Sequence, residues 1–293
     1  MQQTDDPLEQ TRMTLGAHLD ELRRRFMWGG GALLVAFLVC WGFRDQISQI
    51  ILQPGELAVG WYDDARIELY EEKLADDASL ERTEYFASSD PKEDRLMQPT
   101  QWPPFADGAS GGFFFLMKCC FYFAMFIAGP IVLLQMWLFI GAGMYTHEKS
   151  AVYRYLPFSV ILFFSGALFG YFVMVPNAYY YVAAMAIGTV TLLPKVDVYF
   201  TFLSSLSLAM GAVFQLPILM IGLTRMGLIE VRSFAKYRGH FALVALVLSA
   251  VITPPDPYTQ IMMATPMIVL YEAGIHLSKL FSRRKPAALD VDA

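Results

Sequence analysis

The stretch FFFLMKCCFYFAMFIAGPIVLLQMWLFI, residues 113–140, decides the class of this protein. It carries one charged side chain, Lys118, and a helix needs about 20 apolar residues to cross the hydrocarbon core of a bilayer. The whole chain agrees, because 56% of its 293 residues are hydrophobic, 17% are charged and the mean hydropathy is +0.42. Soluble domains carry about 25% charged residues. This composition excludes a disordered chain, a basic nucleic-acid-binding protein and a typical soluble enzyme.

Five further apolar segments accompany this stretch, at residues 26–50, 155–176, 199–224, 241–252 and 258–277. We therefore predict an all-α, polytopic membrane protein with six transmembrane helices. Segment 241–252 is too short to span a bilayer upright. The proline-rich turn after it, residues 253–257, predicts a tight hairpin with the last segment. The first ten residues, MQQTDDPLEQ, lack the pattern of a cleavable signal peptide, so we expect none.

The positions of Lys and Arg predict the orientation. Basic residues precede the first segment, follow the last, and lie between segments two and three and between four and five. Since cytoplasmic loops carry the excess of Lys and Arg, both termini should be cytoplasmic. We expect a cytoplasmic N-terminal segment at 1–25, a six-helix membrane domain at 26–282 and a cytoplasmic tail at 283–293.

The first loop on the other side, residues 55–112, is long and acidic. Apolar residues at helical spacing predict a short amphipathic helix near 64–75. A solvated extramembrane cap and a docking surface for a partner are both open interpretations of this loop.

Several prolines lie in or beside the apolar segments, and each one kinks a helix or ends it. They are Pro130, Pro157, Pro176, Pro217 and Pro266. Kinked helices favour a concave bundle. Of the polar residues at membrane depth, Lys118 is expected to snorkel to the headgroups. Gln215 is expected to bond the carbonyl that Pro217 frees, or to serve function.

Neither cysteines nor histidines form a metal-ligand or disulfide pattern, so we expect no metal and no cofactor. The cysteines are Cys40, Cys119 and Cys120. A third class of function, an intramembrane enzyme, would need a catalytic pair, and Ser204, Ser205 and Ser207 have no histidine at the same depth.

An ordered set of short motifs carries a family resemblance. The set is HLDELRRR at 18–25, QMWLFI at 135–140, MYTHEK at 144–149, GYFVMVP at 170–176, FQLP at 214–217 and TPPD at 253–256, with Gln260 after it. In this order, over residues 12–54 and 113–282, the chain resembles TatC, the subunit family of the twin-arginine protein translocase.

The resemblance implies a function. TatC-like proteins are concave six-helix receptors of the cytoplasmic (inner) membrane that bind twin-arginine signal peptides of folded cargo. They work in oligomeric complexes with TatA and TatB, single-span proteins, and the proton-motive force drives transport. The resemblance therefore implies a receptor, not an enzyme and not a nucleic-acid-binding protein. The alternative is a six-helix small-molecule transporter or channel, which would need a polar lining.

The resemblance also implies the site that binds the signal peptide: Glu21, Glu148, Arg23, Arg25 and the apolar-face residue Phe139. A chemical argument supports this site independently of the resemblance. The guanidinium of a peptide arginine pairs bidentately with a carboxylate, so a receptor for two arginines needs carboxylates. Structural roles remain open. Glu21 is spaced to pair with Arg25 or Arg24 on one helix face, and Glu148 with the dipole of the third helix.

Further matched positions are implied in the same way. Gln215, Thr253 and Gln260 match contacts with a partner helix, although glutamine at 215 does not ionise. Pro54 and Asp256 match outer-loop positions, and Tyr171 matches an apolar-face position; all three are assigned structural roles. Two features depart from the family, namely the long loop 55–112 and the sequence Gly-Ala-Gly at 141–143, where the family often carries a proline.

Overall fold

The computed structural model describes residues 15–76, 100–106, 108–142, 149–185, 187, 193–225, 228–253 and 255–282. Within these residues every regular element is a helix, apart from an isolated β-bridge between Phe105 and Lys195. Five apolar stretches of helix are long enough to cross a membrane, and α10 (Arg238–Ile252) is a shorter apolar helix. In the described part of the chain, the six predicted apolar segments are therefore helical, and the fifth is short as predicted.

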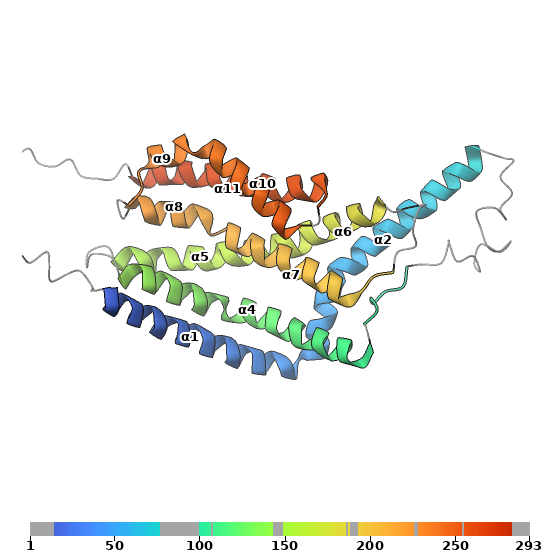
Figure 1. Ribbon diagram of the computed structural model, residues 1–293, viewed down its shortest axis with the longest axis horizontal. Coiled ribbons are helices and arrows are strands. Elements are labelled where there is room, and N and C mark those ends of the chain that lie inside the picture. Colours follow the sequence, from blue (N-terminus) through green and yellow to red (C-terminus); the bar gives the residue numbers. More distant parts are fainter. Residues whose placement is uncertain are drawn as a thin grey trace, which may run out of the picture.

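The helices lie side by side along one axis (Figure 1). α1 (Leu15–Gly42) packs along α4 (Gly108–Ala142), and α5 (Lys149–Phe169) packs on α4 and on α7 (Val196–Val213). α8 (Leu216–Arg225) continues α7 and packs on α11 (Pro257–Ser282), which α10 and the short α9 (Val231–Lys236) cover.

The start of α1 and the end of α11 lie at the same end of the molecule, on the left of Figure 1. We call this the terminal end and the other the opposite end. The predicted even number of crossings requires the start of α1 and the end of α11 to lie on one side of a membrane, and this arrangement fits.

The prediction of a single helix over residues 26–50 is wrong. α1 ends at Gly42, and a separate helix, α2 (Arg44–Asp76), leaves across the opposite end of the bundle. Glycine weakens a helix, and the charges of Arg44 and Asp45 favour the membrane surface over its interior. Asp45 also lies in the first turn of α2, where the helix dipole favours a carboxylate. These three features explain the break.

α2 also corrects the prediction for loop 55–112, since the short helix expected near 64–75 is the end of this much longer one. Hydrogen bonds join two distant parts of this acidic segment. Asp63 of α2 accepts from the backbone N–H and the hydroxyl of Thr100, at 2.8 and 2.7 Å. Asp63 also forms an ion pair with Arg66 at 3.1 Å, and Arg66 is buried. These contacts tie residue 100, far along the chain, to α2.

The third segment does not end at Pro176 as predicted. A π-helical turn, η2 (Gly170–Met174), follows α5, and α6 (Val175–Ala184) continues to Ala184. Proline lacks an N–H donor and is tolerated in the first turn of a helix. Pro176 lies in that first turn, directly after the π-helical turn, so the chain passes through it without a break.

Two glycines bring this helix against α7. A Cβ atom at Gly170 would lie 2.6 Å from the Cα atom of Ser207, and one at Gly166 would lie 2.6 Å from the carbonyl oxygen of Met210. Small residues spaced four apart let membrane helices approach closely. This contact fixes α5, η2 and α7 as one unit behind the site described next.

Candidate functional site

An open apolar groove runs along α1, α4 and α7 and consists of two cavities that meet. Each has a volume of about 650 Å³. The inner cavity reaches the terminal end and includes Leu22, Arg25, Val132, Gln135 and Phe139 in its lining. The outer cavity reaches toward the opposite end and includes Leu34, Phe37, Lys118, Phe121 and Ser204 in its lining. Gly30, Leu33, Met125 and Leu208 line both cavities.

Predicted site residues meet at the inner end of this groove. Arg25 Nε donates to Glu21 Oε1 at 2.6 Å, one helical turn away on α1, and the two side chains form an ion pair. Arg25 Nη1 also donates to Gln135 Oε1 of α4 at 3.2 Å. The side chains of Glu21 and Arg25 are only 15% and 25% exposed. Of the two open interpretations for Glu21, the structure realises the pairing with Arg25 rather than Arg24.

The other predicted residues of this site are placed in part. Phe139 lines the inner cavity, and Arg23 is exposed on α1. Glu148 lies outside the described residues, and so does most of the stretch 141–148. A site that contains both Glu148 and Glu21 therefore stays a prediction. Lys149, the next residue in the chain, begins α5 at the terminal end.

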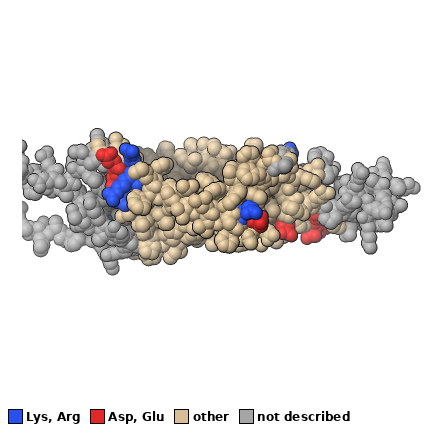
Figure 2. Space-filling model, turned by 90° about the horizontal axis from the view of Figure 1, so that it is seen from below, with Lys and Arg blue, Asp and Glu red and all other residues tan. Residues whose placement is uncertain are grey.

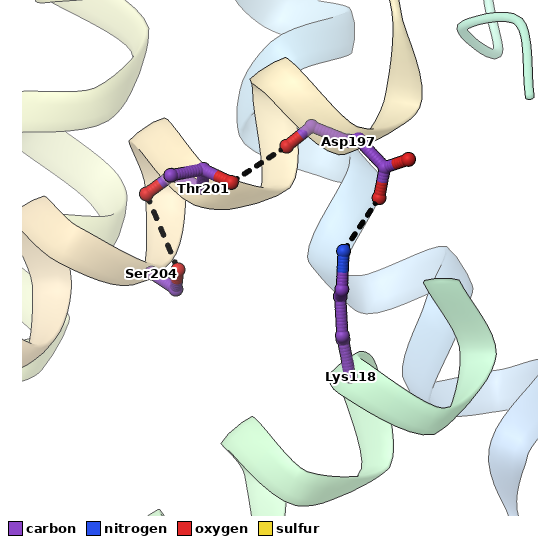
Figure 3. A network of polar contacts seen from close by, with 4 residues as sticks. All are labelled: Lys118, Asp197, Thr201 and Ser204. Atoms are coloured by element: carbon purple, nitrogen blue, oxygen red, sulfur yellow. Dashed lines mark hydrogen bonds and ion pairs between the residues drawn. The ribbon is translucent and has the colours of Figure 1, made fainter. Parts of the chain in front are cut away.

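A second ion pair lies on the outer cavity. Lys118 Nζ of α4 donates to Asp197 Oδ1 of α7 at 2.7 Å (Figure 3). Figure 2 shows a broad tan band between charged side chains at its two ends, and a small blue patch beside a red one interrupts this band. The expected snorkelling of Lys118 to the headgroups stays a prediction, and the structure adds a carboxylate partner for it.

Gln215 is buried, and its amide is bonded inside the chain. Its Nε2 donates to the carbonyl oxygen of Ser159 at 3.0 Å, the hydroxyl of Ser159 donates to its Oε1, and Trp137 Nε1 donates to that hydroxyl at 3.1 Å. The expected bond to the carbonyl freed by Pro217 is therefore wrong. Gln215 joins α4, α5 and the α7–α8 junction, and any contact with a partner helix remains a prediction.

Pro54 lies inside α2 and is buried rather than in an outer loop. A proline removes the N–H that would bond the carbonyl four residues earlier. That carbonyl, of Ile50, accepts a hydrogen bond from the hydroxyl of Tyr171. The hydroxyl of Tyr199 donates to the Ile51 carbonyl and accepts from the Gly55 N–H, both at 2.9 Å. Two tyrosines thus complete the broken turn.

The hairpin between α10 and α11 contains the remaining predicted residues. Asp256 caps α11, because its Oδ1 accepts from the Thr259 N–H at 2.8 Å and its Oδ2 from the Thr259 hydroxyl. Thr253 is buried and donates to the Ser249 carbonyl at 2.8 Å. Gln260 Nε2 donates to the Leu246 carbonyl of α10 at 3.0 Å. The predicted tight hairpin is confirmed. Gln260 joins its two helices, and Thr253 bonds within the last turn of α10.

Sequence reasoning did not assign roles to Gln135, Ser159 and Asp197. Each is a polar residue in or at the edge of an apolar segment, which is the signal that could have found them. Within the described ranges no three His, Cys, Asp or Glu side chains gather as a metal ion would need.

The fold and this site define a polytopic helical membrane protein with an open apolar groove and a carboxylate–guanidinium pair at its inner end. The profile of one family, described as "Sec-independent protein translocase protein (TatC)", matches residues 17–266. The chain therefore belongs to the TatC family of Sec-independent protein translocase subunits.

Individual relatives agree with this assignment. The chain is 32% identical to the Sec-independent protein translocase protein TatC of Halothiobacillus neapolitanus, over 98% of this chain and 69% of that protein. It is 37% identical to the TatC protein of Aquifex aeolicus, over 59% of this chain and 72% of that protein. A crystal structure of the twin arginine translocase receptor TatC covers 91% of this chain and all of its own, with 29% identity and a TM-score of 0.66. These relatives are transport components.

Proposed function

We propose that this chain is a receptor of the inner membrane that binds twin-arginine signal peptides of folded cargo at the inner end of the groove. In this proposal the terminal end faces the cytoplasm, with segments 1–25 and 283–293 on that side and the acidic segment after α2 outside. The observation that carries the proposal is the shielded carboxylate of Glu21, which is paired with Arg25 in the lining of an apolar groove. The family of the chain supports it.

Glu21 already has a partner, and this defines how a peptide would bind. Arg25 contacts one carboxylate oxygen of Glu21, Oε1, through both Nε and Nη2. A guanidinium of the peptide would then bond Oε2, or displace Arg25 toward Gln135, to which Arg25 is already bonded. Because Arg25 neutralises Glu21, the second carboxylate, Glu148, supplies the additional negative charge that two arginines need.

The groove suits the apolar stretch that follows the two arginines in such a leader. Charged hydrogen bonds of about 1.5–3 kcal/mol each give an affinity between millimolar and tens of micromolar for two bonds. Apolar burial adds about 25 cal/mol per Å². Val132, Leu133 and Phe163 line the inner cavity beyond Arg25 and offer that surface. The same apolar lining does not favour a small-molecule channel.

The proposal also includes the partner proteins and the source of energy for transport. TatA-type and TatB-type single-span helices would pack on the exposed apolar face of α10, which Leu243, Val247 and Val251 form. Gln260 lies between α11 and α10, and Thr253 is buried at the end of α10. The described residues hold no chain of ionisable groups through the membrane, so the proton-motive force would act on the assembled complex.

Site-specific photo-crosslinking tests the proposal. The probe residue is placed at Val132 in the groove or, as a matched control, at Ile161 of α5, which is exposed but does not line the groove. A twin-arginine leader should crosslink at Val132 and not at Ile161, and a twin-lysine leader only weakly. Glu21→Ala and Glu148→Ala should each reduce the crosslink while membrane insertion stays intact. Undiminished crosslinking in both variants would remove these carboxylates from the site.

A further inference from the structure

The ion pair between Lys118 and Asp197 lies where a membrane-facing surface should be apolar. Lys118 falls inside the apolar stretch Ser110–Phe139, and Asp197 is near the start of the stretch Val196–Arg225. The side chains are 43% and 41% exposed, so the pair is open to its surroundings. Ionisable residues at this depth are costly to place in a membrane and are functional candidates.

The pair is neutral but strongly dipolar, and each partner has bonding capacity left. A lysine ammonium has three donors, and the bond to Asp197 uses one of them. Behind Asp197, Thr201 donates to the Asp197 carbonyl at 2.8 Å and Ser204 donates to the Thr201 carbonyl at 3.2 Å (Figure 3). The hydroxyl oxygens still accept, so this side offers acceptors for an ammonium group.

From the ion pair toward the terminal end, the outer cavity forms an apolar groove of limited length. Its lining on α4 runs from Met117 to Met125, which is about 12 Å at about 1.5 Å per residue. One leaflet is half of the roughly 30 Å hydrocarbon core, about 15 Å. Phe37, Phe121 and Phe200 line the walls.

We propose that the outer cavity binds one phospholipid of the outer leaflet whose headgroup carries a primary ammonium beside its phosphate, as in phosphatidylethanolamine. The phosphate lies on Lys118, the ammonium on Asp197 and Thr201, and an acyl chain fills the cavity toward Gly30. A headgroup with both charges matches the dipole of the pair, whereas an anionic headgroup meets Asp197 with like charge. The leaflet follows from the orientation given under the proposed function, whereas the binding of the lipid does not depend on the binding of a leader peptide.

A partner helix is the competing occupant, and the charges of the ion pair argue against it. Lys118 and Asp197 are both partly exposed, and an apolar membrane-spanning helix would bury them without offering partners for their charges. A headgroup with a phosphate and an ammonium offers both.

Native mass spectrometry of the purified full chain tests the proposal with three dioleoyl lipids: phosphatidylethanolamine, phosphatidylcholine and phosphatidylglycerol. The first should be retained about tenfold better than the other two, the difference expected from lost charged hydrogen bonds. Phosphatidylcholine has no N–H donor, and phosphatidylglycerol has no cation. Replacing the pair by Lys118→Leu with Asp197→Leu should abolish this preference, and an apolar replacement of an ion pair generally preserves folding.

Two glycines of α1 give a matched pair of variants for the acyl chain. A Cβ atom at Gly30 or at Gly31 meets nothing within 4 Å, but only Gly30 lines the cavity. Gly30→Leu should reduce lipid retention about tenfold, and Gly31→Leu should leave it unchanged. Equal retention of all three lipids by the native chain, or unchanged retention in Gly30→Leu, would overturn the proposal. So would loss of the lipid whenever a single-span partner co-purifies, because the cavity would then belong to that helix. Crosslinking of a leader peptide at Val132 tests the proposed function, and it is measured separately from lipid retention.

Discussion

The hydroxyl of Tyr171 donates to the carbonyl oxygen of Ile50, the carbonyl that Pro54 leaves without its helical donor. Tyr171 comes from the π-helical turn and Ile50 from α2, so this bond joins the third membrane crossing to the helix that leaves the bundle. The hydroxyl of Tyr199 bridges the neighbouring residues of the same turn, because it donates to the Ile51 carbonyl and accepts from the Gly55 N–H. The turn of α2 that Pro54 interrupts is therefore bonded by side chains from η2 and α7.

Removing the Tyr171 hydroxyl should destabilise the fold only while Pro54 is present. Tyr171→Phe leaves the Ile50 carbonyl unbonded, which costs about 1–3 kcal/mol. In a Pro54→Ala background the restored N–H can bond that carbonyl, so the same change should have a much smaller effect. Thermal unfolding of the four variants in detergent measures this coupling. An equal loss in both backgrounds would show that the bond does not compensate for the proline.

Gly170→Ala should separate the third crossing from α7. The added Cβ atom would lie 2.6 Å from the Cα atom of Ser207, and backbone cannot move aside as a flexible side chain can. Overpacking of this kind costs typically about 1–3 kcal/mol. The control is Gly31→Ala, where nothing lies within 4 Å and where loss of a helical glycine should be neutral or stabilising. Similar unfolding temperatures for both variants would contradict the close contact.

Gln215→Leu should destabilise the junction of α7 and α8 by about 1–3 kcal/mol, because the hydroxyl and carbonyl of Ser159 lose their partner. In a Ser159→Ala background the loss should be smaller, since one of the two groups is then absent. Unfolding free energies of the four proteins give the coupling between the side chains. If the losses of stability in the two single variants simply add in the double variant, the side chains of Gln215 and Ser159 do not stabilise each other.

Asp256→Ala should fray the start of α11, because the aspartate accepts from the Thr259 N–H and hydroxyl. Loss of such a cap costs about 0.5–2 kcal/mol. Asp256→Asn keeps an acceptor and should retain most of the stability. Hydrogen exchange in the first turn of α11 reports the difference, and equal protection in both variants would argue against capping.

Apolar length and charge placement were enough to predict the number and approximate places of the apolar helices. The prediction extended the first segment through Gly42 to residue 50, although Arg44 and Asp45 just after the glycine mark the break. The sequence did not show that a long helix, α2, follows this break and leaves the bundle. Nor did Pro176 reveal that its helix continues, since the π-helical turn before it absorbs the missing donor.

The candidate site was predictable where neighbours in sequence are neighbours in space. Glu21 and Arg25 are one turn apart on one helix, so their pairing followed from spacing. The bonds of Arg25 to Gln135, of Lys118 to Asp197 and of Gln215 to Ser159 join different helices. Their register depends on packing contacts such as those at Gly166 and Gly170, which no local pattern specifies.

The central claim is that carboxylates at the inner end of the groove recognise the paired arginines of a leader peptide. The most direct test measures leader affinity in a double-mutant cycle: Glu21→Gln with Glu148→Gln in the protein, and twin arginine to twin lysine in the leader. In the native chain the lysine leader should bind at least about tenfold more weakly. In the variant the two leaders should bind almost equally. A lysine penalty of the same size in both proteins would contradict the account, because the arginines would then be recognised elsewhere.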